Sequence, residues 1–157
     1  MDLVILWLLL CFLSFGMLGF RFFYMKQAAS KLWKIKIDKN YKPKVSIVVP
    51  TYNESKVIRL KLENLSKVEY PKDLKQIILV DSRSDDGTID IVNNFVKLHP
   101  EPNILVLVEN ERKGKSAALN FALEHCTGDV IIISDADSFW PSDILSKSLP
   151  FLADPEV

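Results

Sequence analysis

Two aspartates one residue apart, Asp135 and Asp137, come directly after the β-branched apolar run Val130–Ser134. That run predicts a buried strand, and in extended backbone residues i and i+2 point the same way. Two converging carboxylates at a strand end suit a hard divalent cation such as Mg²⁺ or Mn²⁺. The same pair also suits a turn, because aspartate side chains accept backbone hydrogen bonds there. By itself the pair leaves a metal site and a plain turn both open.

Three further groups of polar residues follow apolar runs in the same way. They are PTYNES at 50–55, DSRSDDGT at 81–88 and ENERKGK at 109–115. If the runs are parallel strands, these segments meet at the carboxyl ends of the strands, where open α/β sheets bind ligands. Together they offer an aromatic ring, several carboxylates and a Lys- and Arg-rich turn. A nucleotide diphosphate with its metal requires this set of groups.

Two other nucleotide-binding motifs are excluded by the positions of glycine. Gly114-Lys115-Ser116 resembles the end of a P-loop, but Glu109 stands where that motif needs its first glycine. A dinucleotide fold needs G-x-G-x-x-G after its first strand, and residues 50–55 contain no glycine. Hydride chemistry is therefore not expected.

The elements that would hold these loops alternate between short apolar runs and segments of helical period. In a chain of 157 residues, 48% of them hydrophobic, this predicts one α/β domain. We expect a parallel sheet covered by helices on both faces, with right-handed crossovers. The expected strands and helices alternate in the order Val45–Val49, Lys56–Leu65, Gln76–Val80, Ile89–Leu98, Ile104–Val108, Ala117–Leu123 and Val130–Ser134. Gly128 stands where a left-handed residue is expected to end the last of these helices.

The N-terminal segment is a separate apolar stretch. Residues 3–20 carry no charge, and a helix rising about 1.5 Å per residue over them would cover most of a roughly 30 Å hydrocarbon layer. We expect a transmembrane anchor over residues 1–25, with Arg21 reaching the interface. A cleaved signal peptide is the alternative, because Ala28-Ala29-Ser30 offers small residues. The length of the run and the lack of a preceding positive charge favour a retained anchor.

Charges behind the apolar stretch are strongly uneven. Residues 21–44 hold eight Lys and Arg residues against Asp38 alone, although the formal net charge of the chain is zero. Basic residues beside a span mark its cytoplasmic side. We therefore expect residues 26–44 to be a basic linker that contacts anionic membrane lipids rather than nucleic acid, with the remainder in the cytosol. Cys11 and Cys126 match no disulfide or metal-ligand pattern, which agrees with a reducing compartment.

The motifs PTYNES, VDSRSDDGT, RKGKSAALN and SDAD occur in this order at successive predicted strand ends. With this set, residues 43–157 resemble the family 2 glycosyltransferases of GT-A fold, and more narrowly the membrane-bound branch of cellulose, chitin and hyaluronan synthases. The resemblance implies a Rossmann-like parallel sheet of GT-A type over residues 45–157, truncated before the domain ends. It also implies inverting transfer of a sugar from a nucleotide-diphosphate donor to a hydroxyl of a growing polysaccharide or lipid-linked glycan.

Roles in binding the base follow from the same resemblance. Pro50, Thr51, Tyr52 and Glu54 belong to the loop that holds the base, and the Tyr52 ring is suited to stacking on uracil. Asp81 matches the aspartate that accepts a hydrogen bond from the base. The usual D-D-G-S-T-D-G-T is replaced here by DSRSDDGT, which keeps the first aspartate and the D-G-T end. The resemblance implies UDP as the nucleotide.

Roles at the diphosphate and the metal also follow from the resemblance. Lys115 matches the lysine that neutralises the diphosphate, and Asn120 matches the asparagine that closes the same motif. Asp135 and Asp137 match the D-x-D pair. Asp137 is the expected ligand of Mg²⁺ or Mn²⁺, and Asp135 is expected to support the ribose or the metal shell.

The family's catalytic base and its Q-x-x-R-W element lie downstream of the D-x-D strand, and this sequence stops at Val157. We therefore expect a fragment of a longer enzyme, with the base beyond that residue. A truncated, non-catalytic donor-binding or assembly module in the membrane is the alternative. A nucleotidyltransferase is a third possibility, but it would need a glycine-rich loop where PTYNES stands.

Overall fold

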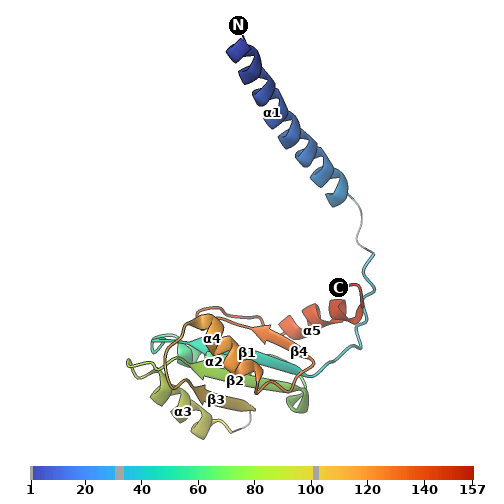
Figure 1. Ribbon diagram of the computed structural model, residues 1–157. Coiled ribbons are helices and arrows are strands. Elements are labelled where there is room, and N and C mark those ends of the chain that lie inside the picture. Colours follow the sequence, from blue (N-terminus) through green and yellow to red (C-terminus); the bar gives the residue numbers. More distant parts are fainter. Residues whose placement is uncertain (1, 31–33, 101–102) are drawn as a thin grey trace. The chain divides into compact units, whose positions relative to one another are not determined.

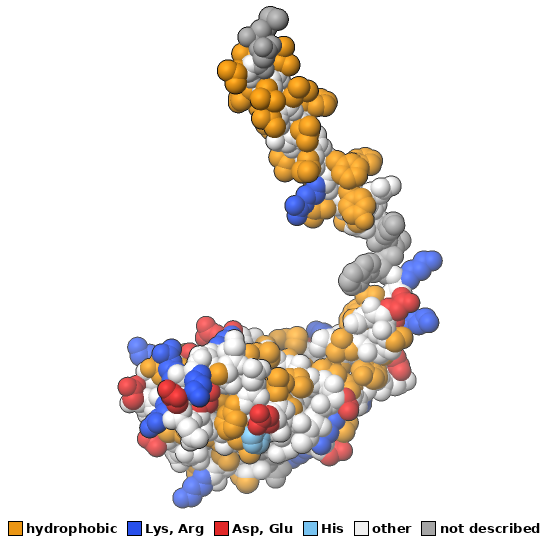
Figure 2. All heavy atoms as spheres, in the orientation of Figure 1, with side chains coloured by type: hydrophobic (Ala, Val, Ile, Leu, Met, Phe, Trp, Pro, Cys, Tyr) orange, Lys and Arg blue, Asp and Glu red, His pale blue; other side chains and the backbone are white. Residues whose placement is uncertain are grey.

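The computed structural model describes residues 2–30, 34–100 and 103–157, in two compact units divided between Ile35 and Lys36. The first unit contains a single described helix, α1 (Asp2–Ala29). Large apolar side chains are exposed along this helix, as Figure 2 shows. From Leu3 to Ala29 it is long and apolar enough to cross a membrane. The apolar stretch is thus one continuous helix that runs past residue 25.

The second unit is built on a four-stranded sheet of order β3-β2-β1-β4, in which all neighbouring strands are parallel. Figure 1 shows the alternating elements β1 (Val45–Thr51), α2 (Ile58–Ser66), β2 (Lys75–Asp81), α3 (Thr88–Leu98), β3 (Ile104–Val108), α4 (Lys115–Leu123), β4 (Val130–Ile133) and α5 (Ile144–Ser148). Short 3₁₀ helices, η1 (Lys72–Leu74) and η2 (Leu149–Ala153), precede β2 and follow α5. The predicted alternation is confirmed, with each boundary within two residues of its expected place.

Two apolar clusters lie on opposite faces of the sheet. One contains the buried side chains of α2, α3 and α5, namely Ile58, Leu62, Leu65, Val92, Phe95 and Leu145. On the other face, Ala118 and Ala122 of α4 pack against the central strands, and Figure 1 shows α4 crossing in front of them. The expected cover on both faces is therefore present over β1 and β2. The edge strand β4 differs, because Ile131 and Ile133 remain 43% and 53% exposed.

The prediction that Gly128 is a left-handed residue at the end of a helix is wrong. Among the described glycines, Gly87 and Gly114 have positive φ, and Gly128 does not. A Cβ atom added at Gly128 would instead lie 2.5 Å from the Ser46 nitrogen and 2.7 Å from the Val45 carbonyl carbon. The position therefore requires the absence of a side chain rather than a left-handed backbone, because the chain entering β4 passes close to β1.

Residues 36–44 of the expected linker belong to the second unit. The Lys36 amide donates to the Asp154 carboxylate at 2.8 Å, and the Asp38 amide donates to the Pro150 carbonyl oxygen at 3.2 Å. Backbone hydrogen bonds, first from Lys36, hold the pKa of Asp154 below its usual range. This part of the chain is therefore tied to the segment that follows α5.

Candidate functional site

The polar segments that follow the four strands come together at one edge of the sheet. Register pairs Thr51 with Asp81 and Asp81 with Val108, so β1, β2 and β3 end at the same level. A cavity of about 320 Å³ opens at this edge. Most residues predicted to hold a donor or a metal line it: Pro50, Thr51, Tyr52, Glu54, Lys115, Asp135 and Asp137.

Four lining residues are not singled out by the sequence: Ser82, Arg112, Gly114 and Ala136. Among them, Arg112 has the most direct bearing on the site, because its guanidinium carbon lies 3.8 Å from the centre of the Tyr52 ring. Guanidinium groups stack on aromatic faces, so Arg112 occupies a ring face that a base would use. The Lys- and Arg-rich composition of residues 109–115 indicates a cation at the site, but no spacing rule shows that Arg112 rather than Lys113 reaches the cavity.

The amino end of α4 adjoins the same cavity. Gly114 precedes this helix with a φ of 92°, a conformation that residues with side chains rarely adopt. Helix amino ends carry unpaired N–H groups and partial positive charge, and they bind phosphate groups. Lys115 adds a full positive charge at the first position of the helix and is exposed. This end of the cavity suits a diphosphate.

Asp135 and Asp137 lie in a turn directly after β4. The Ser138 amide donates to the Asp135 carbonyl oxygen at 3.2 Å, so the turn that the sequence also allowed is present. Ala136 is buried while both aspartates are exposed. The Lys115 ammonium donates to Asp135 Oδ1 at 2.5 Å. The Asp137 carboxylate makes no hydrogen bond or ion pair with any residue of the described ranges, and it is therefore accessible from the cavity.

The turn after β4 offers a divalent cation two carboxylates at the cavity, those of Asp135 and Asp137. Within the parts of the chain that the structure describes, no group of three or more His, Cys, Asp and Glu side chains is placed to hold a metal ion. Mg²⁺ commonly binds through one or two carboxylates and completes its shell with water and substrate phosphates. Asp135 and Asp137 fit that mode, in which the metal is shared with a diphosphate, rather than a closed protein site.

Asp81 is the predicted site residue that does not line the cavity. It is 1% exposed. Its Oδ2 accepts a hydrogen bond from the Ser84 amide at 2.8 Å, and its Oδ1 accepts one from the Ser84 hydroxyl at 2.5 Å. The Thr51 hydroxyl lies 3.4 Å from the same Oδ1. Both oxygens are therefore engaged within the protein, and contact between Asp81 and a base stays a prediction.

The loop after β2 braces the loop after β1. Asn53 exchanges two hydrogen bonds with Asp85, of 2.9 and 3.1 Å. The Ser55 amide donates to Asp86 Oδ2 at 2.9 Å. A hydrogen bond from the Thr88 hydroxyl, followed by those from Ser55, holds the pKa of Asp86 well below its usual range. Asp85 and Asp86 thus hold the two loops together, and neither lines the cavity.

A buried lysine lies behind the Asp135–Asp137 turn. Lys61 of α2 is 0% exposed, and its Nζ donates to the Ser134 hydroxyl and to the Ser138 carbonyl oxygen, each at 2.5 Å. Burial lowers the pKa of Lys61 to about 8, against the opposing effect of both aspartates in the turn. Sequence reasoning missed this residue, because a lysine within a helix is expected to be solvated.

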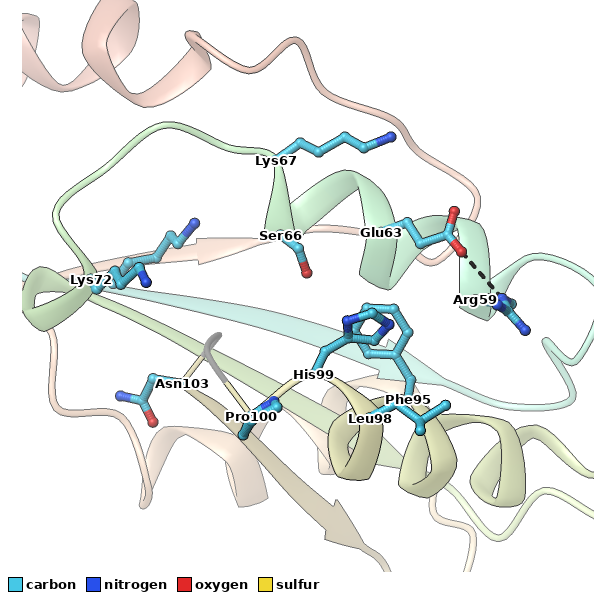
Figure 3. A pocket seen from close by; sticks show the side chains of 11 residues that line it. Arg59, Glu63, Ser66, Lys67, Lys72, Phe95, Leu98, His99, Pro100 and Asn103 are labelled. Atoms are coloured by element: carbon cyan, nitrogen blue, oxygen red, sulfur yellow. Dashed lines mark hydrogen bonds and ion pairs between the residues drawn. The ribbon is translucent and has the colours of Figure 1, made fainter.

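A larger cavity, of about 660 Å³, lies between α2 and α3. In Figure 3, Phe95, Leu98 and His99 from α3 and its end face the Arg59–Glu63 ion pair of α2, whose nitrogen and oxygen are 3.1 Å apart. The carboxylate of Glu63 is already paired, and this cavity lies away from the loops that follow the strands. Size alone therefore does not identify the functional site.

The chain resembles solved glycosyltransferases over most of its length. The mannosyltransferase PcManGT from Pyrobaculum calidifontis, solved in complex with GDP-Man and Mn²⁺, matches with a TM-score of 0.84 and 39% identity, over 93% of this chain and 43% of that one. The S. aureus TarS fragment 1–349 in complex with UDP-GlcNAc gives a TM-score of 0.61 and 30% identity, over 67% of this chain and 30% of that one. These neighbours confirm the expected parallel α/β sheet of GT-A type.

Sequence relatives agree with the structural ones. The probable glycosyltransferase YdaM of Bacillus subtilis (strain 168) is 37% identical over 141 residues, which are 87% of this chain and 33% of YdaM. The chain therefore spans about a third of the length of that relative. Residues 46–157 match glycosyl transferase family 2. The chain belongs to this family.

Proposed function

We propose that this chain is the donor-binding part of a membrane-anchored, inverting glycosyltransferase. Its reaction would transfer a sugar from a nucleotide-diphosphate donor to a hydroxyl of a growing polysaccharide or lipid-linked glycan. The observation that carries the proposal is that Tyr52, Lys115, Asp135 and Asp137 line one cavity. An aromatic ring, a cation and a carboxylate pair correspond to the base, the diphosphate and the metal of such a donor.

Asp137 and Asp135 are the proposed ligands for Mg²⁺ or Mn²⁺. When bound, the metal neutralises the phosphates, whose negative charge grows as the bond to the sugar breaks. Asp137 makes no hydrogen bond or ion pair with any residue in the described ranges and would be the direct ligand. Asp135, whose Oδ1 accepts a hydrogen bond from Lys115, would support the ribose or the water shell of the metal.

Lys115 and the amino end of α4 are proposed to hold the diphosphate. The transition state of sugar transfer resembles an oxocarbenium ion and leaves negative charge on the departing group. A fixed positive charge beside that group stabilises it without supplying a proton. The ion pair between Lys115 and Asp135 is more than half exposed on both sides. Breaking it costs little, because exposed pairs contribute only about 0.2–1 kcal/mol.

Tyr52 and Thr51 are proposed to hold uracil, which makes a UDP-sugar the donor. Stacking on a tyrosine ring suits any base, so the competing donor is a GDP-sugar. Both nucleotides occur among the solved relatives, which are described with UDP-GlcNAc and with GDP-Man. Pro50 and Glu54 border the same side of the cavity.

Helix α1 is the proposed anchor, with the second unit on the cytoplasmic side of the cell membrane. The eight basic residues between positions 21 and 44 support this side and contact with anionic lipids. The anchor also supports a place in the branch of cellulose, chitin and hyaluronan synthases, whose acceptors are glycans at a membrane. Protease added outside intact cells is expected to leave the second unit uncut. Cleavage from outside would contradict this orientation.

Calorimetry on the full chain in detergent micelles tests the proposal, using UDP and GDP with and without Mn²⁺. We expect UDP to bind, Mn²⁺ to strengthen that binding at least about tenfold, and Lys115→Ala to weaken it. Failure to bind either nucleotide would overturn the proposal. Tighter binding of GDP than of UDP would change only the base assigned to the donor, from uracil to guanine. Sugar release from a UDP-sugar would rule out the non-catalytic module. Binding without turnover is expected both of that module and of a donor-binding part whose base lies beyond Val157.

A further inference from the structure

Helix α2 holds the segment that carries Asp135 and Asp137. Lys61, fully buried in this helix, donates from Nζ to the Ser134 hydroxyl and to the Ser138 carbonyl oxygen, each at 2.5 Å. The same nitrogen lies 3.3 Å from the Ser138 hydroxyl. Ser134 immediately precedes the first aspartate and Ser138 immediately follows the second. One ammonium group therefore ties together both ends of the turn.

Asn64 holds the same segment from the next turn of α2. Its side-chain amide donates to the Trp140 carbonyl oxygen at 2.8 Å, and its side-chain oxygen accepts from the Trp140 amide at 2.9 Å. The Lys61 ammonium lies 5.0 Å from the centre of the Trp140 ring, within cation–π range. Because helical residues three apart are neighbours, one face of α2 fixes the chain from Ser134 to Trp140.

The burial of Lys61 is not explained by packing alone. Removing an ammonium group from water is costly unless it is paired and hydrogen-bonded, and an apolar side chain would fill the space without that cost. The compensating groups all belong to the segment after β4. They are the oxygens of Ser134 and Ser138, the ring of Trp140 and the negative charges of the two aspartates.

We propose that Lys61 is a positioning residue for the Asp135–Asp137 turn. By holding both ends of the turn, it keeps the two carboxylates at the cavity, so that they need not be ordered when a cation and a diphosphate bind. Lys61 does not itself line the cavity and acts through the turn. This inference rests on the proposed function, because it takes the turn to be the metal site.

Lys75 provides a matched control. It is a second buried lysine, 8% exposed, whose Nζ donates to the Val68 carbonyl oxygen at 2.6 Å and to that of Leu65 at 3.4 Å. It begins β2, at the end of the strand opposite to the cavity. Lys61→Met and Lys75→Met therefore each remove a buried ammonium from a carbonyl contact, beside the turn in one variant and away from it in the other.

Amide hydrogen exchange of the full, metal-free chain in detergent micelles is the first test. We expect Lys61→Met to speed exchange over residues 134–140 at least about tenfold and to leave β1 unchanged, because the turn alone loses its support. Lys75→Met is expected to leave residues 134–140 unchanged. Unaltered exchange of this segment in Lys61→Met would overturn the inference, whatever the protein binds.

Titration of the full chain with UDP, with and without Mn²⁺, is the second test. Lys61→Met is expected to reduce the Mn²⁺ enhancement at least about fivefold and to keep the metal-free affinity within about twofold, whereas Lys75→Met keeps both. Equal losses of UDP affinity in Lys61→Met with and without Mn²⁺ would show a merely structural role and overturn the inference. If Lys61→Met does not fold, Asn64→Ala provides the same comparison. A wild-type chain without Mn²⁺ enhancement would overturn the proposed function instead, and hydrogen exchange would still decide the role of Lys61.

Discussion

The guanidinium carbon of Arg112 lies 3.8 Å from the centre of the Tyr52 ring. Arg112 comes from the segment after β3 and Tyr52 from the loop after β1, and both line the cavity that Lys115 also borders. A base that stacks on this face of Tyr52 must displace Arg112. The displaced guanidinium then becomes available to the phosphates of the same ligand.

Replacing Arg112 should therefore separate nucleotide from nucleoside binding. We expect Arg112→Ala to weaken UDP binding about three- to tenfold, because a cation near the phosphates is lost. Uridine binding should stay unchanged or improve slightly, because the ring face is freed. Calorimetry with both ligands measures the difference, and Arg59→Ala, in α2 outside this cavity, is the control. Equal losses for UDP and uridine would contradict the expectation.

Asp86 gives a prediction for stability as a function of pH. Hydrogen bonds, chiefly from the Thr88 hydroxyl, depress the pKa of Asp86 in the folded chain. Such a carboxyl stabilises the fold above its unfolded pKa of 3.8, and this contribution is lost as the pH falls through the folded pKa. We expect Asp86→Asn to lower the melting temperature by a few degrees at pH 7.

The difference in melting temperature between Asp86→Asn and the wild type should shrink as the pH falls from about 4 toward 2. The wild-type carboxylate becomes protonated over this range, and its contribution to stability is lost. Thermal unfolding followed by circular dichroism over this range checks the trend, with Asp90→Asn as the exposed control. A difference that does not change with pH would show that the charge of Asp86 is not responsible.

Gly128 gives a prediction for packing. An alanine there would bring its Cβ to 2.5 Å from the Ser46 backbone nitrogen, which cannot rotate away. We expect Gly128→Ala to lower the free energy of unfolding by about 1–3 kcal/mol or more. Gly16→Ala is the control, because its Cβ would meet nothing within 4 Å. Denaturant titrations that show equal stabilities would rule out the close approach.

The order of strands and helices was predictable because the spacing of apolar residues along the sequence follows which side chains are buried. Strands β1 and β2 are almost wholly buried, and their apolar runs at residues 47–49 and 77–80 are visible in the sequence. The start of α4 was less predictable, since it depends on the positive φ of Gly114 rather than on hydrophobicity. Gly128 was misread for a related reason. Positive φ and close backbone approach both select glycine and look the same in a sequence.

The candidate site was predictable where it depends on strand ends, and not where it depends on side-chain partners. Parallel strands bring Tyr52, Lys115 and the two aspartates to one edge, whatever the loops do in detail. The burial of Lys61 depends on Ser134, 73 residues further along the chain, and local sequence does not report such a contact. The hydrogen bonds from Ser84 to both oxygens of Asp81 could not be predicted from the sequence either, and contact between Asp81 and a base stays a prediction.

Metal binding by Asp137 is the central claim, and one titration tests it most directly. Calorimetry of the full chain compares the Mn²⁺ enhancement of UDP binding in the wild type, Asp137→Ala and Asp90→Ala, where Asp90 is an exposed residue of α3 outside the cavity. We predict that Asp137→Ala reduces the Mn²⁺ enhancement of UDP affinity at least about tenfold, whereas Asp90→Ala leaves it unchanged. An unchanged Mn²⁺ enhancement in Asp137→Ala would contradict the metal role of this carboxylate.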